Sequence, residues 1–443
     1  MSEKNYQFDT LKVRAGYNPS EHNNSIQVPI YQTAAFDLIS TERAKRILNF
    51  EELAYVYTRV GNPTLAALEA RVSALDGAAA AVSVASGMAA VSFAILNAAE
   101  GGRIIVAAQI YGGTYDAYKN TYPKLGVQVD IVEDVNDLEA IRSLIKEDTK
   151  AIFIESISNP INVIADIEAI ANLAHEHGLP LIVDNSFATP YLLNPIKYGA
   201  DVVVYSATKS LSGHGSVIAG IILESGKFDW AGGRHPQFTD KKYTLQNRSV
   251  IEALPLFPFT GRIRINHLPL LGASLGPFDA YQVLQGIETL SERVKKQTES
   301  AYIIAEFLST HPKVSWVSLP TLKESKYKTL ADKYFPKGAG GTFSFGFNGD
   351  EEETNKFIDS LELFSYHANV GDARSLVINS ARTTHGELTE EEQQYAGIKL
   401  ETVRLSIGLE DVTDLIADLN QAFDKVTDNP SSESIIREKV LEY

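Results

Sequence analysis

ADVVVYSATKSLSGHG, residues 200–215, contains a run of β-branched side chains that predicts a buried strand. The run ends in Ser206, Thr208 and Lys209, and a glycine-rich turn follows. In an extended chain the side chains of residues 206 and 208 point to the same side. A site for pyridoxal 5′-phosphate (PLP) needs such a set of groups: the two hydroxyls can bind its phosphate, and the amine can condense with its aldehyde. Because most lysines after a strand are ordinary surface residues, this hypothesis depends on the rest of the chain.

Around this stretch, between residues 78 and 225, apolar runs alternate with helical segments. The runs that predict strands are 78–84, 103–108, 127–132, 150–156, 179–185, 201–207 and 217–223. Strands that are apolar throughout and alternate with helices favour an α/β fold with a mainly parallel seven-stranded sheet and helices on both faces. The last two runs are separated by a short gap, so the direction of that pair stays open. Ligands in such sheets bind beyond the carboxyl ends of the strands.

Three further segments complete the organisation. Residues 1–62 lack a strand pattern and are expected to form an arm; Asn62 and Pro63 then cap and open a helix. Residues 226–280 form an excursion rich in glycine, proline and aromatic residues within the domain 63–280. A long helix near 281–310 and the strand-like runs VSWVSLP, GTFSFGF, SLVINSA and TVRLSIGL predict a smaller α+β domain over 281–443, which ends in a polar tail.

Composition excludes several classes of protein. The 443 residues are 44% hydrophobic and carry a net charge of −16, which argues against a general nucleic-acid or anionic-membrane surface. The chain has no cysteine, so disulfides, iron–sulfur clusters, Cys-ligated zinc and a thiol nucleophile are excluded, and no metal site is expected. The sequence contains neither a signal-peptide core nor an apolar run of about 18 residues. We therefore expect a cytoplasmic protein.

Two other predicted strand ends carry residues that suit a phosphorylated aromatic ligand. The first run leads through Ser86, Gly87 and Met88 into an apolar helix. A small residue and a glycine at the start of a helix expose backbone N–H groups that can bind an anion. The second leads to Tyr111, which precedes two glycines and could lie flat on an aromatic ring. Taken alone, each is equally a common turn or a packed tyrosine.

The fourth and fifth runs end in Asn159 and Asp184. Asn159 could donate a hydrogen bond to a phenolic oxygen, although Asn-Pro is also simply a good turn. A buried aspartate is costly when unpaired, and pairing with a pyridinium N–H would remove that cost. Asp184 and Lys209 lie on consecutive strands, so they could reach opposite ends of one ring. We interpret the coincidence of all these features at one sheet edge as a PLP site.

At this point the chain resembles the Cys/Met-metabolism family of PLP enzymes, the γ-family of the aspartate-aminotransferase fold. The resemblance covers nearly the whole length. It is carried by YTRVGNPTLAALE (57–69), ASGMAAV (85–91), YGGTYDAY (111–118), ESISNP (155–160), VDNSFATPYLLNPIKYGADVVVYSATKSLSGHG (183–215) and VRLSIGLED (403–411). It implies the PLP-dependent transferase fold type I with a smaller C-terminal domain.

The resemblance also implies roles around the cofactor. Lys209 would be the Schiff-base lysine, Asp184 would pair with the pyridine nitrogen, and Tyr111 would stack on the ring. Lys209, Tyr111 or Tyr57 would take part in proton transfer. The phosphate would be surrounded by Ser86, Gly87, Met88, Ser206 and Thr208.

Substrate and subunit contacts are implied in the same way. Arg404 would bind the substrate α-carboxylate, and Asn159 would contact the ring oxygen and the substrate. Tyr57 and Arg59 would reach the phosphate of the neighbouring subunit, so the active sites would be shared. This implies a homo-oligomer that is at least a dimer, with a tetramer as the usual assembly. A loop at 366–375, which includes Asn369, would face the substrate.

Within the family, the chain is most similar to the sulfhydrylase branch. The chain is longer than cystathionine enzymes because of the 226–280 excursion, and its 366–375 loop lacks their usual Ser-Leu-Gly pattern. The resemblance implies γ-replacement of acetate in O-acetyl-L-homoserine by sulfide, which gives homocysteine and acetate. A cystathionine γ-synthase-like or methionine γ-lyase-like enzyme is the alternative. The acyl donor, the sulfur nucleophile and the choice between dimer and tetramer stay open.

Overall fold

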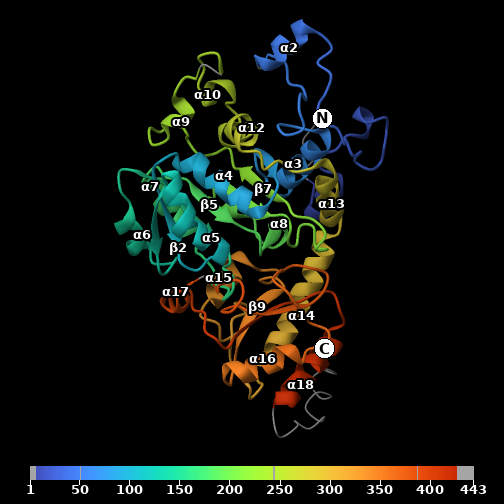
Figure 1. Cartoon of the computed structure of the whole chain (residues 1–443), viewed down its shortest axis with the longest axis vertical. Coiled ribbons are helices and arrows are strands. Elements are labelled where there is room, and N and C mark those ends of the chain that lie inside the picture. Colours follow the sequence, from blue (N-terminus) through green and yellow to red (C-terminus); the bar gives the residue numbers. More distant parts are fainter. Residues whose placement is uncertain (1–5, 50, 243–244, 387, 427–443) are drawn as a thin grey trace. The chain divides into compact units, whose positions relative to one another are not determined.

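The computed structural model describes residues 6–49, 51–242, 245–386 and 388–426. The chain divides into two compact units (Figure 1). Unit 1 comprises Met1–Ala108, Thr114–Ser156 and Ala165–Ser291, and unit 2 comprises Gln109–Gly113, Ile157–Ile164 and Glu292–Tyr443. The polar tail from residue 427 onward lies outside the described residues. The three-part organisation expected from the sequence stays a prediction.

Unit 1 is built on a seven-stranded sheet with the strand order β1-β7-β6-β5-β4-β2-β3. All neighbours are parallel except that β7 runs antiparallel to both β1 and β6, which settles the direction that the sequence left open. The strands are β1 (Ala80–Val84), β2 (Arg103–Ala107), β3 (Gln128–Val132), β4 (Thr149–Glu155), β5 (Leu181–Asp184), β6 (Val202–Ser206) and β7 (Gly220–Glu224). The predicted mainly parallel α/β sheet is confirmed.

Helices join these strands and pack on the sheet. Helix α3 begins after Asn62, whose side chain accepts from the Thr64 N–H, and ends at Gly77, which has a φ of 68°. These caps are the ones the sequence predicts. The helical segments are α3 (Pro63–Asp76), α4 (Gly87–Ala99), α5 (Gly112–Asp116), η2 (Ala117–Thr121), η3 (Tyr122–Leu125), α6 (Leu138–Leu144), α7 (Ile167–Glu176), α8 (Thr189–Leu192), η4 (Pro195–Tyr198) and α13 (Pro277–Glu288).

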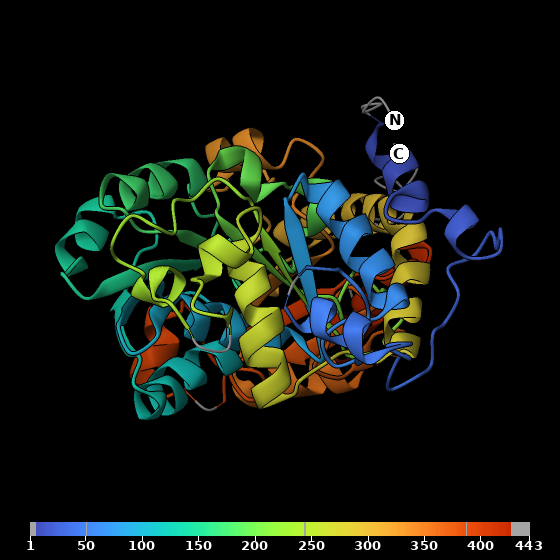
Figure 2. The same ribbon diagram turned by 90° about the horizontal axis from the view of Figure 1, so that it is seen from above.

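The arm and the excursion of unit 1 are more helical than the sequence indicates. The arm contains α1 (Phe8–Arg14), η1 (Pro19–Glu21) and α2 (Thr41–Leu48), and α2 protrudes from the rest of the unit (Figure 1). The excursion contains α9 (Pro236–Thr239), α10 (Val250–Ala253), α11 (Pro258–Arg262), η6 (Ile263–His267) and α12 (Leu268–Leu271). Figure 2 shows the yellow excursion beside the blue arm, and Arg248 donates to the carbonyl of Asn49 at 2.9 Å. These helices are short, so their periodicity is weak in the sequence.

Unit 2 contains a five-stranded sheet with the order β10-β11-β12-β9-β8. Its elements are α14 (Leu290–Ser309), β8 (Val314–Val317), α15 (Lys328–Tyr334), β9 (Thr342–Phe347), α16 (Glu351–Asp359), β10 (Ser365–Tyr366), β11 (Leu376–Asn379), α17 (Glu390–Tyr395), β12 (Thr402–Ser406) and α18 (Val412–Val426). Phe343, Phe345 and Phe347 of β9 pack with Phe357 and Phe423 in its core. The predicted α+β character is confirmed, but the single helix expected near 281–310 is wrong: α13 ends at Glu288, and α14 begins at Leu290.

No described helix combines the length and the apolar character that crossing a membrane would require.

Candidate active site

The start of α4, at the end of β1, has the features of an anion-binding position. Ser86 is the N-cap of this helix, and its hydroxyl accepts from the Ala89 N–H at 3.0 Å. Backbone N–H groups at a helix start have no partner within the helix, and the helix dipole adds partial positive charge. Met88 lies in this first turn, and Thr114 donates to its sulfur at 3.6 Å. The arrangement fits the phosphate of the expected cofactor.

Gly87 and Ser206 lie against each other at the adjacent ends of α4 and β6. A Cβ atom added to Gly87 would stand 2.5 Å from the Ser206 Cβ and 2.7 Å from its Oγ. Gly220 of β7 approaches Ser86 equally closely, since a Cβ there would lie 2.0 Å from the Ser86 carbonyl oxygen. Only glycine permits this approach, which brings the helix start and the Ser206 hydroxyl into one cradle.

Asp184 lies at the carboxyl end of β5, next to β6, and is tied to the cradle through Ser186. The Ser186 N–H donates to Asp184 Oδ1 at 2.9 Å, and the Ser186 hydroxyl accepts from the Ser206 N–H at 2.7 Å. Burial raises the pKa of Asp184, and its hydrogen bonds with Ser186 lower it in part. A pyridinium N–H at this carboxylate would relieve the burial cost. Ser186 was not predicted, because Ser after Asp-Asn is an ordinary turn residue in the sequence.

Lys209 and Thr208 lie in the turn that follows β6. The strand ends at Ser206, so the expectation that residues 206 and 208 share one side of an extended chain is wrong. The Thr208 hydroxyl instead donates to the Ala219 carbonyl at 3.2 Å and accepts from the Ala219 N–H at 3.0 Å. Lys209 is half-buried, and its N–H donates to the Ser206 carbonyl at 3.1 Å. Lys209 therefore follows β6 closely, and Asp184 ends the neighbouring strand β5 of the same sheet.

A buried series of hydrogen bonds begins at Asn185, the residue after Asp184, and no sequence pattern marked it. Asn185 accepts from the Ser156 hydroxyl at 2.7 Å and donates to the Tyr205 oxygen at 2.9 Å. Tyr205 donates to Asp76 Oδ2 at 2.7 Å. Burial raises the pKa of Asp76 to about 7, and the bond from Tyr205 lowers it in part. This chain fixes the backbone that carries Asp184.

Unit 2 brings Asn159, Arg404 and Asn369 together. Arg404, on β12, is 3% exposed and donates to Asn159 Oδ1 at 2.9 Å and to the Asn369 carbonyl at 3.1 Å. Burial lowers the pKa of Arg404 to about 10, which leaves the guanidinium protonated at neutral pH. The partners given by these bonds are neutral, so the cluster carries a buried positive charge that suits a carboxylate.

Tyr111 also belongs to unit 2 and is 41% exposed. Its ring packs on Gly113, where an added Cβ would lie 2.8 Å from a ring carbon, and Gly112 approaches the Thr384 carbonyl oxygen. His385 lies close by, with its Nε2 3.4 Å from the Ile110 carbonyl. Burial lowers the pKa of His385 to about 4, so it is neutral at pH 7. No sequence pattern marked His385.

Tyr57 and Arg59 lie together on an exposed turn of the arm. The Arg59 guanidinium carbon stands 5.0 Å from the centre of the Tyr57 ring, and the ring is 41% exposed. This pair is a cation–π contact that presents both an aromatic face and a positive charge outward.

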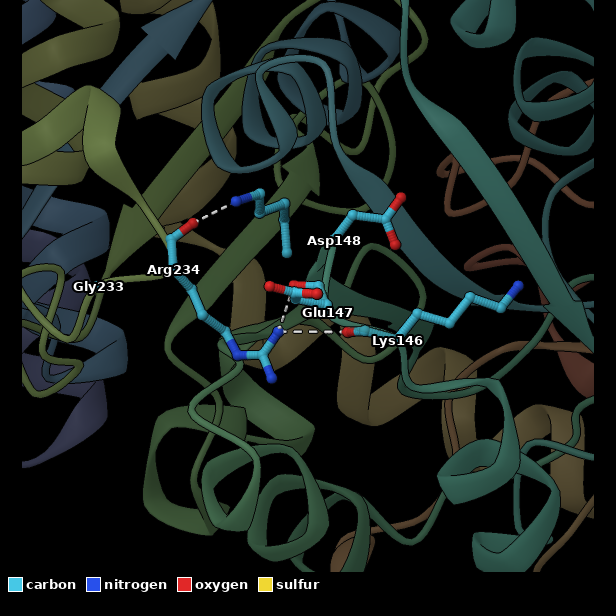
Figure 3. Close-up of a pocket in the computed structure, with 6 residues that line it drawn as sticks. Lys146, Glu147, Asp148, Gly233 and Arg234 are labelled. Atoms are coloured by element: carbon cyan, nitrogen blue, oxygen red, sulfur yellow. Dashed lines mark hydrogen bonds between the residues drawn. The ribbon is translucent and has the colours of Figure 1, made fainter.

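A separate hollow on unit 1 is lined by Lys146, Glu147, Asp148, Lys150, Gly233 and Arg234 (Figure 3). The Arg234 guanidinium donates to the carbonyls of Lys146 and Glu147 at 3.3 and 3.0 Å, and Lys150 donates to the Arg234 carbonyl. Lys146 pairs with Asp130 at 3.2 Å. The cations of this hollow are thus engaged by protein groups, and they attach the excursion to the start of β4. None of these residues was predicted for the site.

Comparisons with known proteins identify the family of the chain. The family model described as Cys/Met metabolism PLP-dependent enzyme matches residues 9–424. An O-acetyl-L-homoserine sulfhydrylase of Leptospira meyeri is 41% identical over 96% of this chain and 98% of its own length. Another, from Thermus thermophilus, is 42% identical over 94% and 99%.

A solved structure also resembles this chain over nearly its whole length. A Campylobacter jejuni protein assigned as an O-acetylhomoserine (thiol)-lyase matches with a TM-score of 0.91 and 40% identity, over 94% of this chain and all of that one. That crystal structure contains an N′-pyridoxyl-lysine-5′-monophosphate residue.

Proposed function

Because the chain belongs to the family of Cys/Met-metabolism PLP-dependent enzymes, we propose that it is an O-acetyl-L-homoserine sulfhydrylase. This enzyme replaces the acetate at Cγ of O-acetyl-L-homoserine by sulfide and yields homocysteine and acetate. The observation that carries the proposal is the match of nearly the whole chain, at 41 and 42% identity, to two relatives of that name. When bound, PLP supplies an aldehyde that attaches an amino group and a ring that accepts electrons from the neighbouring carbon.

In this proposal the residues of unit 1 hold the cofactor and move protons. The start of α4 and the Ser206 hydroxyl bind the phosphate, and Asp184 holds the proton on the ring nitrogen. The Lys209 amine removes the proton from Cα of the amino acid and assists the loss of a proton at Cβ. Acetate then leaves Cγ with the electrons of the C–O bond. Hydrosulfide adds at Cγ, and Lys209 returns the protons to Cβ and Cα.

In unit 2, Arg404 binds the α-carboxylate of the substrate. Its guanidinium can present a planar pair of donors to the carboxylate, and the bond to Asn159 holds the guanidinium in place. The same bond fixes the orientation of the Asn159 amide, whose NH₂ group is the donor that a phenolic oxygen requires. Tyr111 stacks on the ring and assists proton transfer.

We further propose that the enzyme works in the cytoplasm as a homo-oligomer, at least a dimer and in full a tetramer. Its support is the arm, which presents Tyr57 and Arg59 outward together with Ile39 and Leu53, 76 and 86% exposed. Apolar side chains of this size are expected to be covered by a partner surface. Tyr57 and Arg59 would then reach the phosphate of the neighbouring subunit.

The test is an assay of the purified protein with O-acetyl-L-homoserine and sulfide, with Lys209→Ala as the control. Homocysteine formation that depends on Lys209 supports the proposal, and its absence rejects it. Parallel rates with O-succinyl-L-homoserine, and with cysteine or methanethiol as the nucleophile, identify the true substrates. Release of 2-oxobutyrate without a thiol would instead indicate a lyase, and faster formation of cystathionine from cysteine would indicate a cystathionine γ-synthase.

A further inference from the structure

The turn Tyr57–Gly61 is held to the arm on one side. The N–H groups of Val60 and Gly61 both donate to the Tyr57 carbonyl, at 2.9 and 3.1 Å, which closes the turn. Tyr57 pairs with Ala35 in an isolated bridge, and the Thr58 N–H donates to the Ala34 carbonyl at 2.9 Å. These bonds join the turn to other parts of the arm. The Thr58 hydroxyl also accepts from the Asn62 amide at 3.0 Å, and Asn62 is the N-cap of α3, so the end of the turn is tied to the start of that helix.

Arg264, in η6 of the excursion, attaches the middle of the turn to the body of the unit. Its Nη1 donates to the Val60 carbonyl at 2.7 Å, and its Nη2 donates to Glu69 Oε2 at 2.7 Å and to the Ala81 carbonyl at 3.2 Å. One guanidinium therefore spans the turn, helix α3 and strand β1. A lysine, with its single nitrogen at the end of the chain, cannot occupy both positions.

Glu69, which accepts a hydrogen bond from Arg264, is itself held by further hydrogen bonds. It is 8% exposed, and its Oε1 accepts from both the N–H and the hydroxyl of Ser83 at 2.8 Å each. Ser83 belongs to β1, the strand that leads into Ser86 and the phosphate cradle. Arg264 and Glu69 thus connect the turn to β1, the strand that leads into the phosphate cradle of the same subunit.

We propose that Arg264 is a positioning residue: it holds the turn Tyr57–Gly61 so that Tyr57 and Arg59 can complete the cofactor site of the neighbouring subunit. The inference rests on the proposed function insofar as that site is a shared PLP site. It assigns the excursion a purpose, because the excursion of one chain then serves the active site of the other.

The first experiment compares two arginines of the excursion. In Arg264→Met the anchor to the turn is lost; in Arg248→Met, the matched control, a bond to the arm is lost at Asn49 instead. Apoprotein is titrated with PLP and with pyridoxal, which lacks the phosphate. We expect Arg264→Met to raise the Kd for PLP about tenfold or more, with little change for pyridoxal, and Arg248→Met to bind both like wild type. Equal PLP affinity in wild type and Arg264→Met would overturn the proposal.

Hydrogen exchange gives a readout that does not require the cofactor. In Arg264→Met the amides of Val60 and Gly61 should exchange faster than in wild type, because the turn loses the bond that holds the Val60 carbonyl. If Arg264→Met does not fold, Arg264→Lys keeps the positive charge but cannot bridge Val60 and Glu69. It should show the same loss of PLP affinity and of amide protection. Wild-type affinity in a folded Arg264→Lys protein would refute the bridging role.

The second experiment separates action on the neighbour from a local structural effect. Hybrid oligomers are purified with two affinity tags, one on Lys209→Ala chains and one on Arg264→Met chains. The hybrid site that retains Lys209 receives its turn from the Lys209→Ala chain, in which Arg264 is intact. Recovery of wild-type PLP affinity at that site supports the proposal, whereas affinity as weak as in Arg264→Met homo-oligomers contradicts it.

Because PLP affinity is the readout, failure of the sulfhydrylase assay would reject the proposed reaction without deciding the role of Arg264.

Discussion

Replacing Gly87 by alanine tests the phosphate cradle directly. The added Cβ would lie 2.5 Å from the Cβ of Ser206 and 3.0 Å from its Cα. Since carbon atoms pack best at about 3.5–4.0 Å, the start of α4 must move away from β6 by about 1 Å. N–H groups that would donate to the phosphate at about 2.9 Å would then stand at about 3.9 Å, which is too far for a hydrogen bond. Losing one charge-assisted bond weakens PLP binding about ten- to hundredfold.

The assay is a titration of apoprotein with PLP, followed by the absorbance of the bound cofactor. Pyridoxal affinity should change much less, because pyridoxal makes no phosphate contact. Gly102→Ala is the matched control for strain: its Cβ would stand 2.5 Å from a carbon of the Lys150 side chain, but it lies before β2, at the opposite end of the sheet from the cradle. A Kd for PLP in Gly87→Ala within about twofold of wild type would refute the assignment of the cradle.

Three further substitutions test other parts of the molecule. Burial raises the pKa of Asp76 from 3.8 to about 7. Between these two pH values the folded protein keeps a proton that the unfolded chain has lost. The free energy of unfolding should therefore fall by roughly 4 kcal/mol as the pH rises from the lower value to the upper one. Asp76→Asn should remove this dependence in urea unfolding of apoprotein at both ends of the window, and an unchanged pH slope would contradict the assignment. Arg404→Lys should raise KM for O-acetyl-L-homoserine about ten- to hundredfold without changing PLP affinity, because a lysine ammonium cannot donate to Asn159 and to a carboxylate together. A change in kcat alone would argue against carboxylate binding by Arg404. Ser186→Ala removes the side-chain hydrogen bond that lowers the pKa of Asp184, so we expect kcat to fall about tenfold with PLP still bound. A variant with the wild-type kcat would show that this hydrogen bond has no catalytic effect.

The sequence was sufficient for the features that depend on local pattern. The apolar runs gave all seven strands of unit 1, because strands buried on both faces are continuous apolar segments. Asn62 and Gly77 gave the ends of α3, because caps are chemical signals at fixed positions. The short helices of the arm and the excursion escaped detection, since three- to eight-residue segments are too short to show a period.

Residues that act through distant contacts could not be predicted from local pattern. Arg264 meets Val60 across 204 positions, and Tyr205 meets Asp76 across 129. Each partner is unremarkable in its own segment, and only the fold makes the pair. Arg404 was expected to bind a carboxylate only from the family resemblance, because in the sequence it is one arginine within a strand.

The contacts of Arg404 give that expectation a physical basis. Two other buried arginines face a carboxylate: Arg71 lies 3.3 Å from Glu288, and Arg262 pairs with Glu100 at 2.5 Å. Arg404 is bound instead by an amide oxygen and a backbone carbonyl, which orient the guanidinium without neutralising it. Removing a charge from water costs several kcal/mol unless it is paired, and the lowering of the Arg404 pKa to about 10 reflects that cost. The carboxylate of an incoming substrate would recover this cost, so a protein with a net charge of −16 could still attract a carboxylate to this one position.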